Sequence, residues 1–214
     1  MKPGTRALGI AESTDERSGR CVFCGAVVRA DRVVDGVAFA TASVGGLDAT
    51  DAVCTLFERL QREDVRYLLV SGVAPAWFNL LDLDRIAAST ERPVLSVSFE
   101  ESPGLNPALR EQFDGEGLDD RLGIYERLPP RRRLRVNDER LFVRYIGFDD
   151  GEPDTDAASD AASDDDGVPE EITRVVRAYT PVGGRPEPIR VARLAARAAR
   201  QWRAEPFKNT DRSE

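Results

Sequence analysis

The sequence predicts an α/β fold, in which a mixed sheet of antiparallel and then parallel strands is flanked by helices. Residues 21–30 and 33–44 are rich in β-branched residues and punctuated by glycine, with a turn at Ala30-Asp31-Arg32 between them. This pattern is typical of an antiparallel hairpin. Continuous apolar runs follow at residues 65–70 and 93–99 and are separated by helical patterns. Such runs indicate buried parallel strands joined by crossover helices.

The N-terminal part begins with a short strand at residues 6–13, which ends near Glu12. After the hairpin, Asp48 is expected to cap the amino end of the first helix, because an Asp side chain accepts hydrogen bonds from the free N–H groups there. The apolar residues of this helix are spaced i, i+3, i+4 and i+7, which gives it one buried face. These residues are Val53, Leu56, Phe57 and Leu60.

Further helices and a second hairpin complete the chain. Apolar periodicity predicts helices at residues 80–89, 106–113, 118–127, 169–179 and 188–203. Residues 134–136 and 141–146 form a hairpin around Asn137-Asp138. Three antiparallel strands followed by parallel strands fit a ribonuclease H-like fold. A doubly wound nucleotide-binding fold is the alternative, but no Gly-rich loop follows the first strand.

The chain has 214 residues, of which 41% are hydrophobic, so it is long enough for a single domain with a substantial core. We expect this domain to comprise residues 1–148 and 168–204. Residues 149–167 are rich in Asp, Ala and Ser and poor in apolar side chains, which predicts a disordered acidic insertion. Residues 205–214 are expected to form a flexible tail.

Charge and hydropathy point to a cytoplasmic protein. No apolar run approaches the roughly 20 residues of a membrane span, and the N-terminus lacks the apolar stretch of a signal peptide. The net charge is −8, and the 30 basic residues include only two lysines, Lys2 and Lys208, so that 28 are arginines. An acidic, lysine-poor surface suits the salt-rich cytoplasm of a halophile, although a GC-rich genome also favours arginine over lysine.

The histidine and cysteine content restricts the possible chemistry. The chain has no histidine, which excludes a His-based triad and a His-ligated zinc site. Hydrolysis would therefore depend on carboxylates and a hard cation such as Mg²⁺. Cys21 and Cys24 have the spacing of a zinc knuckle or a redox pair. No second knuckle accompanies them, and a strand would direct them to opposite faces, so we interpret them as ordinary strand cysteines.

Four short motifs lie at the ends of the predicted elements. They are Gly9-Ile10-Ala11-Glu12-Ser13, Gly46-Leu47-Asp48-Ala49-Thr50, Ser71-Gly72-Val73 with the following Trp77-Phe78-Asn79-x-x-Asp82, and Pro186-Glu187-Pro188-Ile189-Arg190-x-Ala192. With these motifs the sequence resembles the archaeal endonuclease dU family, which is related to endonuclease V and has a ribonuclease H-like fold. The resemblance implies a DNA-repair endonuclease that recognises deoxyuridine, the product of cytosine deamination, and cuts the phosphodiester with Mg²⁺.

The resemblance also suggests which residues form the site. It implies Glu12, Asp48 and Ser71 as catalytic residues, and Glu12, Asp48 and Asp82 as the carboxylates of a metal site. The sequence departs from the family pattern at three positions: Ala11 replaces an acid at the end of the first strand, Ser71 replaces an acid before Gly72, and Arg193 replaces a histidine on the last helix. The alternative interpretation of Asp48 and Asp82 is that both are simply helix caps.

Aromatic and basic residues are candidates for nucleic-acid contacts. Trp77 and Phe78 could stack on an unpaired base while Asn79 hydrogen-bonds a pyrimidine edge, or the two rings could pack as core while Asn79 closes its own turn. Arg190, Arg193 and Arg197 are predicted to form a stripe on the last helix that contacts the phosphate backbone, with a solvated face as the alternative. A second basic cluster comprises Arg131, Arg132, Arg133 and Arg135.

Three functions remain open at this stage. The first is a Mg²⁺-dependent endonuclease that acts on DNA with a deaminated base. The second is a catalytically reduced nucleic-acid-binding protein of the same fold, and the third is a stand-alone interaction protein. The sequence leaves the choice of DNA or RNA, the cleavage position and the oligomeric state undecided.

Overall fold

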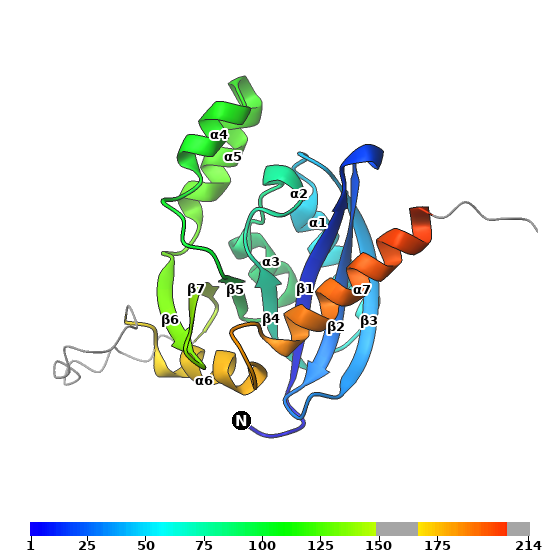
Figure 1. The fold of residues 1–214 in the computed structure, drawn as a ribbon, viewed down its shortest axis with the longest axis vertical. Helices are drawn as coiled ribbons and strands as arrows, with labels where there is room; N and C mark the ends of the chain where they lie inside the picture. The colour runs from blue at the N-terminus through cyan, green and yellow to red at the C-terminus, as the bar shows by residue number, and fades with distance from the viewer. Residues whose placement is uncertain (149–166, 205–214) are drawn as a thin grey trace, which may run out of the picture.

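A seven-stranded mixed sheet forms the centre of the molecule in the computed structural model, which describes residues 1–148 and 167–204 (Figure 1). The strand order is β3-β2-β1-β4-β5-β7-β6. The strands are β1 (Arg6–Asp15), β2 (Arg20–Arg29), β3 (Val34–Ser43), β4 (Val65–Ser71), β5 (Val94–Ser98), β6 (Arg132–Val136) and β7 (Glu139–Ile146). The predicted acidic insertion and tail lie outside the described residues, apart from Gly167, so these predictions stay untested.

The first half of the sheet is antiparallel and the centre is parallel, which confirms the predicted fold class. Strands β1, β2 and β3 form an antiparallel meander. Strand β4 pairs with β1 in parallel, with Ile10 opposite Val70, and β5 continues in parallel with Ser71 opposite Val97. The second hairpin, β6 and β7, extends the sheet at its far edge, where β7 pairs antiparallel with β5. Sequence analysis predicted this hairpin but not its place in the sheet.

Helices cover both faces of the sheet. They are α1 (Ala49–Leu60), α2 (Pro75–Phe78), α3 (Leu83–Thr90), α4 (Asn106–Gln112), α5 (Gly115–Arg127), α6 (Glu170–Tyr179) and α7 (Glu187–Ala204), with one 3-10 turn, η1 (Glu16–Ser18). Helices α1 and α3 pack on one face of the sheet, and α6 and α7 pack on the other. Figure 1 shows α2, α4 and α5 at the end of the sheet where β1 and β4 finish.

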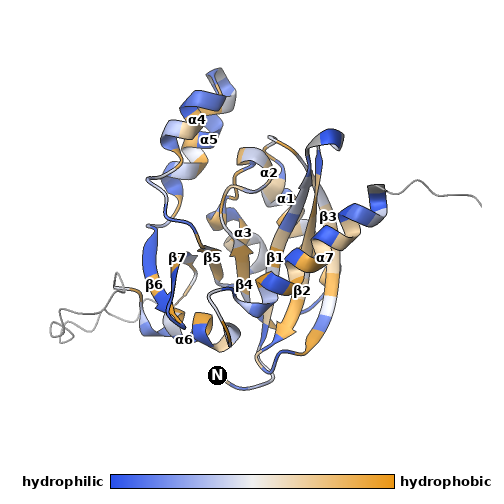
Figure 2. Ribbon diagram, viewed as in Figure 1, coloured by the Kyte–Doolittle hydropathy of each residue, from blue (hydrophilic) through white to orange (hydrophobic). Residues whose placement is uncertain are grey.

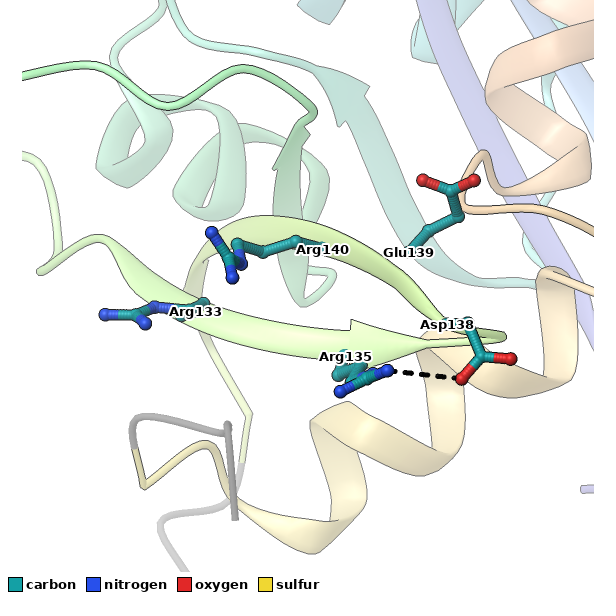
Figure 3. A pocket seen from close by; sticks show the side chains of 5 residues that line it. All are labelled: Arg133, Arg135, Asp138, Glu139 and Arg140. Atoms are coloured by element: carbon teal, nitrogen blue, oxygen red, sulfur yellow. Dashed lines mark hydrogen bonds and ion pairs between the residues drawn. The ribbon is translucent and has the colours of Figure 1, made fainter. Parts of the chain in front are cut away.

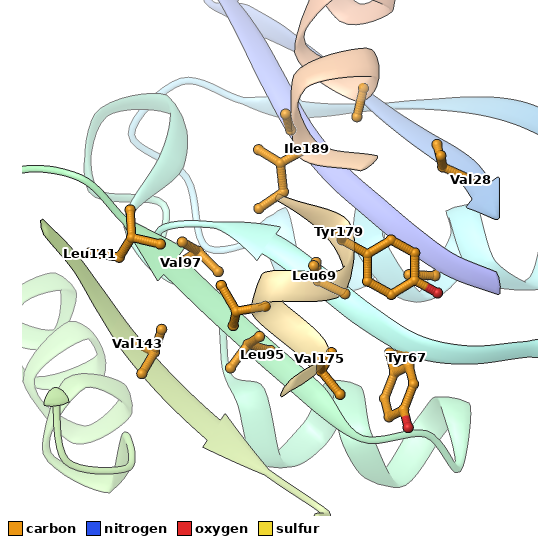
Figure 4. Packing of buried hydrophobic residues seen from close by; sticks show 14 of the residues in the cluster. Val28, Tyr67, Leu69, Leu95, Val97, Leu141, Val143, Val175, Tyr179 and Ile189 are labelled. Atoms are coloured by element: carbon orange, nitrogen blue, oxygen red, sulfur yellow. The ribbon is translucent and has the colours of Figure 1, made fainter. Parts of the chain in front are cut away.

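Two apolar layers separate the sheet from these helices. Figure 4 shows Val175 and Tyr179 of α6 and Ile189 of α7 packed against strand residues that include Leu69 and Val97. Hydropathy follows the same division, since the central strands are largely hydrophobic while β6 is hydrophilic (Figure 2). Because each layer removes apolar side chains from water, burial of both faces is the main stabilising contribution to this fold.

The first strand fixes which residues can face each layer. Leu8 and Ile10 lie in the layer under α1 and α3, whereas Ala7 and Ala11 lie in the layer under α6 and α7. Gly9 is required between them, because a Cβ there would lie 2.0 Å from the carbonyl carbon of Pro188 at the start of α7. The chain therefore brings α7 into backbone contact with β1 at Gly9, where this strand pairs with Leu69 of β4.

The cysteines are structural, as predicted. Cys21 and Cys24 are fully buried and unpaired, and they lie in opposite apolar layers. Burial raises the pKa of the Cys24 thiol to about 12. Because the two thiols lie on opposite sides of the sheet, they cannot share one metal ion. Within the part of the chain that the structure describes, no helix has the length and apolar character that crossing a membrane requires.

Candidate functional site

Ala11 of β1 and Ser71 at the end of β4 lie next to each other, directly after the last paired residues of these two strands. They follow the paired residues Ile10 and Val70 by one position, so both side chains point to the face covered by α6 and α7. Ala11 is buried and Ser71 is half-buried. Ser71 also lies opposite Val97 of β5. A small apolar side chain and a hydroxyl therefore occupy these two positions, and neither carries a negative charge.

Glu12 lies on the opposite face of the sheet from Ser71. Glu12 is two residues after Ile10 in β1, so its side chain points to the same face as that of Ile10. Its carboxylate accepts a hydrogen bond of 2.7 Å from the Thr14 hydroxyl. Burial raises the pKa of the Cys21 thiol to about 11, and the negative charges of Glu12 and Asp48 add to the effect. Glu12 and Asp48 therefore share one face of the sheet, while Ser71 faces α7.

Asp48 forms a hydrogen-bond network with Ser43 and Asn79, which we call the Asp48 network. Its carboxylate accepts bonds from the Ser43 N–H at 3.0 and 3.1 Å, from the Ser43 hydroxyl at 3.0 Å and from the Asn79 amide at 2.7 Å. Burial alone would raise the pKa of Asp48, but these hydrogen bonds outweigh it and hold the pKa below its ordinary value. Asp48 is thus kept ionised by the protein itself.

Asn79 supplies the helix cap that was predicted for Asp48. The Asp48 side chain makes no capping hydrogen bond to α1, so that part of the prediction is wrong. The side-chain oxygen of Asn79 instead accepts from the Ala49 N–H at 2.9 Å, and its amide also donates to the Ser43 carbonyl at 2.9 Å. Asn79 is fully buried. The prediction that Asn79 reads a base edge is corrected accordingly, because its amide groups are engaged within the protein.

Asp82 caps α3, as its alternative interpretation proposed. Its carboxylate accepts from the Arg85 N–H at 3.1 Å and forms an ion pair with Arg127 at 3.1 Å. The three carboxylates predicted for a metal site, Glu12, Asp48 and Asp82, are not brought together. Within residues 1–148 and 167–204, no three Cys, Asp or Glu side chains lie close enough to hold one metal ion.

Arg121 of α5 ties the loop before α1 to the turn that carries Trp77. Its buried guanidinium donates to the carbonyls of Gly45 at 2.5 Å, Gly46 at 3.0 Å and Phe78 at 3.2 Å. It also lies 3.9 Å from the ring centre of Phe113. Sequence analysis missed this residue, because nothing in the pattern of α5 distinguishes it from a surface arginine.

The Trp77 turn has an unusual backbone. Ala76, Trp77 and Phe78 have φ angles of 46°, 60° and 55°, in the left-handed region that non-glycine residues rarely adopt. Each such residue costs on the order of 1–3 kcal/mol unless its surroundings hold it in place. The Gly45 N–H, which donates to the Ala76 carbonyl at 2.8 Å, and Arg121 provide that support. Trp77 remains 55% exposed, with its ring edge-on to Phe78 at 5.6 Å.

The predicted arginine stripe on α7 is heterogeneous. Arg190 forms an ion pair with Glu187 at 2.6 Å, and Arg200 donates to the Ser13 hydroxyl at 2.9 Å. Arg193 and Arg197 are exposed. The stripe therefore combines locally satisfied guanidinium groups with others that face solvent.

A pocket of ≈ 300 Å³ opens beside the ends of β4 and β5. Arg131 and Arg144 contribute to its lining together with Ser96 and Ser98 of β5. Arg131 lies 3.9 Å from the ring centre of Phe142 and donates to the Ser98 hydroxyl at 3.3 Å. Burial lowers the pKa of Arg131, and the charge of Arg144 lowers it further. Sequence analysis missed this pocket, although serine at alternate positions of an otherwise apolar strand could have indicated it.

Two residues of the basic cluster after Pro130, Arg133 and Arg135, line a different pocket. Figure 3 shows Arg133, Arg135 and Arg140 on the β6–β7 hairpin with two acidic residues, Asp138 and Glu139. Arg135 and Asp138 form an ion pair at 3.3 Å. This pocket carries charges of both signs and lies on the hairpin, away from the ends of β1 and β4.

Comparison with known sequences identifies the family. A sequence profile described as Endonuclease dU matches residues 3–172, which is 170 of the 214 residues. The chain belongs to the endonuclease dU family. A UPF0215 protein of Pyrobaculum aerophilum is 30% identical over 197 residues, which cover 91% of this chain and 94% of the relative. A UPF0215 protein of Thermococcus gammatolerans is 29% identical over 206 residues, with 92% and 93% covered.

Solved structures support the same fold. A protein of unknown function from Archaeoglobus fulgidus is 26% identical, with a TM-score of 0.72 and coverage of 91% of this chain and 97% of that protein. Endonuclease V of Ciona intestinalis, solved with a 24mer DNA containing an inosine, has a TM-score of 0.57 at 11% identity, with 92% and 87% covered. Endonuclease V of Streptomyces avermitilis has the same TM-score at 17% identity, with 95% and 84% covered. The ribonuclease H-like fold and the family resemblance are therefore confirmed.

Proposed function

We propose that this member of the endonuclease dU family is a nuclease that acts on DNA containing deoxyuridine. The observation that supports this proposal is the profile match over residues 3–172, which includes every strand of the sheet. DNA as the substrate is further supported by the likeness in fold to endonuclease V, since the Ciona intestinalis enzyme was solved with DNA. Repair of deaminated cytosine is the role that this substrate implies.

The Trp77 turn supports a nucleic-acid substrate on physical grounds. A strained backbone that several contacts hold in place is typical of functional positions, and here it exposes a large aromatic ring. Base stacking on such a ring contributes about 1–3 kcal/mol per base and does not depend on base identity. We propose that Trp77 holds an unpaired base at the end of the sheet, with the Phe78 ring edge-on against its own.

The residues present do not fit a two-metal site. Such a site needs bridging carboxylates at adjacent strand ends, but Ala11 and Ser71 occupy these positions and Glu12 points to the other face. Asp48 already accepts four hydrogen bonds, so a cation would have to displace its protein donors. We therefore assign no step of the reaction to Mg²⁺. The assay below tests whether activity depends on added Mg²⁺.

The second candidate is a DNA-binding protein that retains the fold without cleavage. The juxtaposition of Ala11 and Ser71 favours it, because neither side chain offers a negative charge to offset a divalent cation. In this case the Trp77 turn and the arginines would bind a deoxyuridine site without hydrolysing the backbone.

One assay separates the two candidates. Purified protein is incubated at high salt with duplex and single-stranded DNA, each with and without one deoxyuridine, in Mg²⁺ or in EDTA. Mg²⁺-dependent cleavage confined to the deoxyuridine strand would support the nuclease, and Glu12→Gln should then remove it if Glu12 is a ligand. Binding that prefers deoxyuridine without product would support the second candidate. Absence of both binding and cleavage would refute the proposed function.

A further inference from the structure

The ≈ 300 Å³ pocket beside the ends of β4 and β5, which we call the β5 pocket, is built on one face of the sheet. Ser96 follows Leu95, whose side chain faces α6 and α7, so the Ser96 side chain points to the opposite face. Arg144 of β7 is paired with Ser96 across the antiparallel ladder and therefore shares that face. The two side chains line the pocket together.

The hydroxyl of Ser96 has no partner in the protein. Ser96 is only 3% exposed, yet its side chain forms no hydrogen bond within residues 1–148 and 167–204. Ser98, two residues later, shows the contrast, because its hydroxyl donates to the Phe142 carbonyl and accepts from Arg131, each at 3.3 Å. Buried polar groups in native proteins are nearly always hydrogen-bonded. The partner of Ser96 must therefore come from the contents of the β5 pocket.

Arg131 and Arg144 place two positive charges at the same pocket. The guanidinium of Arg131 lies 3.9 Å from the ring centre of Phe142, which is two residues before Arg144 and on the same face of β7. No carboxylate in the described part of the chain forms an ion pair with either arginine; the nearby Glu101 is paired with Arg140 at 3.9 Å.

Burial makes these two charges costly. It lowers the pKa of Arg131 and that of Arg144, although a guanidinium stays protonated in proteins. Glu100 is the acidic residue that lines the pocket, but it is exposed and, among the described residues, forms no ion pair. Two half-buried cations without a counter-ion repel each other, and an anion between them removes that repulsion.

The two arginines have different numbers of donors left for a ligand. Arg131 donates to the Ser98 hydroxyl, to the Glu100 carbonyl and, at 3.3 Å, to the Ser102 carbonyl, so it holds the loop after β5. Arg144 donates from Nη1 to the Pro129 carbonyl, which leaves most of its five donors for other partners. Arg144 is thus the main candidate for direct contact with an anion, and Arg131 adds charge.

The β5 pocket is too large for an inorganic anion alone. Its volume of ≈ 300 Å³ would hold roughly ten water molecules. Val73, Ala74, Leu105 and Tyr125 form apolar walls, and the Tyr125 hydroxyl fixes one of them by accepting from the Leu105 N–H at 3.1 Å. Apolar walls with a few converging polar groups are typical of sites for small organic ligands.

We propose that the β5 pocket binds a phosphate monoester, with the phosphate between Arg144 and Ser96 and the organic part against Val73 and Leu105. A monoester carries a charge of about −1.5 to −2 at neutral pH, so it balances two guanidinium groups better than the single charge of a phosphodiester. Two sources carry this group, a free 5′-mononucleotide and the 5′-phosphate end of a DNA strand. The inference rests on the pocket and not on the proposed function.

Calorimetric titration of the full chain tests the site. The probes are deoxyadenosine 5′-monophosphate and deoxyadenosine, which differ only in the phosphate and contain no uracil, at constant high ionic strength. The monophosphate should bind at least tenfold more tightly than the nucleoside. Equal affinity for the two probes, or no binding of the monophosphate at about 10 mM, would overturn the proposal.

The variants are Arg144→Gln, Arg144→Lys and Ser96→Ala, with Arg110→Gln as the control. Arg110 is exposed on α4 and lies outside the β5 pocket, so its replacement changes the net charge equally. Affinity for the monophosphate should fall about tenfold or more in Arg144→Gln and in Ser96→Ala. It should be partly restored in Arg144→Lys and unchanged in Arg110→Gln.

Thermal unfolding without ligand gives a readout that a structural role for Ser96 would reverse. Because the hydroxyl has no protein partner to lose, Ser96→Ala should leave Tm unchanged or raise it. A lower Tm with unchanged affinity for the monophosphate would show that the hydroxyl is structural and would overturn the site. Ser96→Ala also decides the test if Arg144→Gln does not fold.

Single-stranded DNA identifies the source of the phosphate and separates this inference from the proposed function. A 5′-phosphorylated strand that binds more tightly than the same strand with a 5′-hydroxyl, with the difference lost in Arg144→Gln, would support the strand end. Equal binding of the two strands, together with binding of the monophosphate, would support the free mononucleotide. Monophosphate binding without DNA binding or cleavage would refute only the proposed function, whereas cleavage of deoxyuridine DNA without monophosphate binding would overturn only the site.

Discussion

Replacing Asn79 by alanine should destabilise the protein strongly, although Asn79 lies in a loop between two short helices. The change removes three hydrogen bonds, to Asp48 at 2.7 Å, to Ser43 at 2.9 Å and from Ala49 at 2.9 Å. A neutral hydrogen bond contributes about 0.5–1.5 kcal/mol and one to a charged group about 1.5–3 kcal/mol. The expected decrease in the free energy of unfolding is therefore about 3–5 kcal/mol.

Urea unfolding measures this decrease directly. For a chain of this size it corresponds to a fall in Tm of roughly 6–20 °C, with a lower midpoint and an unchanged m value. Asn106→Ala is a matched control, because Asn106 is exposed at the start of α4, and it should change stability by less than about 0.5 kcal/mol. A decrease below about 1 kcal/mol for Asn79→Ala would refute the importance of the Asp48 network.

Asn79→Asp provides an independent check on the same network. The new carboxylate would lie against that of Asp48, so its pKa in the folded state should rise above the unfolded value. The variant should therefore be unstable at neutral pH and regain stability as the pH falls through that raised pKa, because the protonated acid can donate to Asp48 as the amide does. Stability that is independent of pH between about 7 and 5 would contradict this account.

Three further outcomes are expected. Trp77→Ala should weaken binding of single-stranded DNA by about 1–3 kcal/mol and leave the melting temperature nearly unchanged. Trp202→Ala, which removes another exposed tryptophan, should leave DNA binding unchanged, and equal weakening by the two changes would argue against base stacking on Trp77. Because the pKa of Asp48 is lowered in the folded state, its contribution to stability is present above its unfolded pKa of about 3.9 and disappears as the pH falls through the folded value; acid titrations of wild type and Asp48→Asn should converge at low pH. Ala11→Asp combined with Ser71→Asp should raise Mg²⁺ affinity in calorimetry more than either change alone, and additive single effects would show that the two positions do not share a cation.

Elements defined by local periodicity were predictable from the sequence. The apolar spacing of α1 and the continuous run of β4 predicted elements within about one residue of those observed. The cap at Asp82 was equally local, since its acceptor and the Arg85 donor are three residues apart. The alternation of strand residues also implied that Ala11 and Glu12 face opposite sides, so Glu12 could not replace a carboxylate at position 11.

The rest of the site depends on contacts between residues far apart in the chain. Asp48 and Asn79 are 31 residues apart, and Arg121 reaches Gly45 across 76 residues. No local motif predicts such pairs, because the two partners become neighbours only when distant segments of the chain pack together. For the same reason, the sequence could not show that the Asn79 amide is bound within the protein and is not free to contact a base.

The contact between Gly9 and Pro188 has a consequence for how the chain folds during synthesis. The first strand is made at the beginning, but the helix that covers its Ala7 and Ala11 side is made almost last. Until residue 204 has left the ribosome, the apolar surface of β1 and β2 on that side lacks its cover. Such non-local closure is intrinsically slow, and an uncovered surface invites aggregation. The nascent protein should therefore be prone to aggregation until α7 has been made.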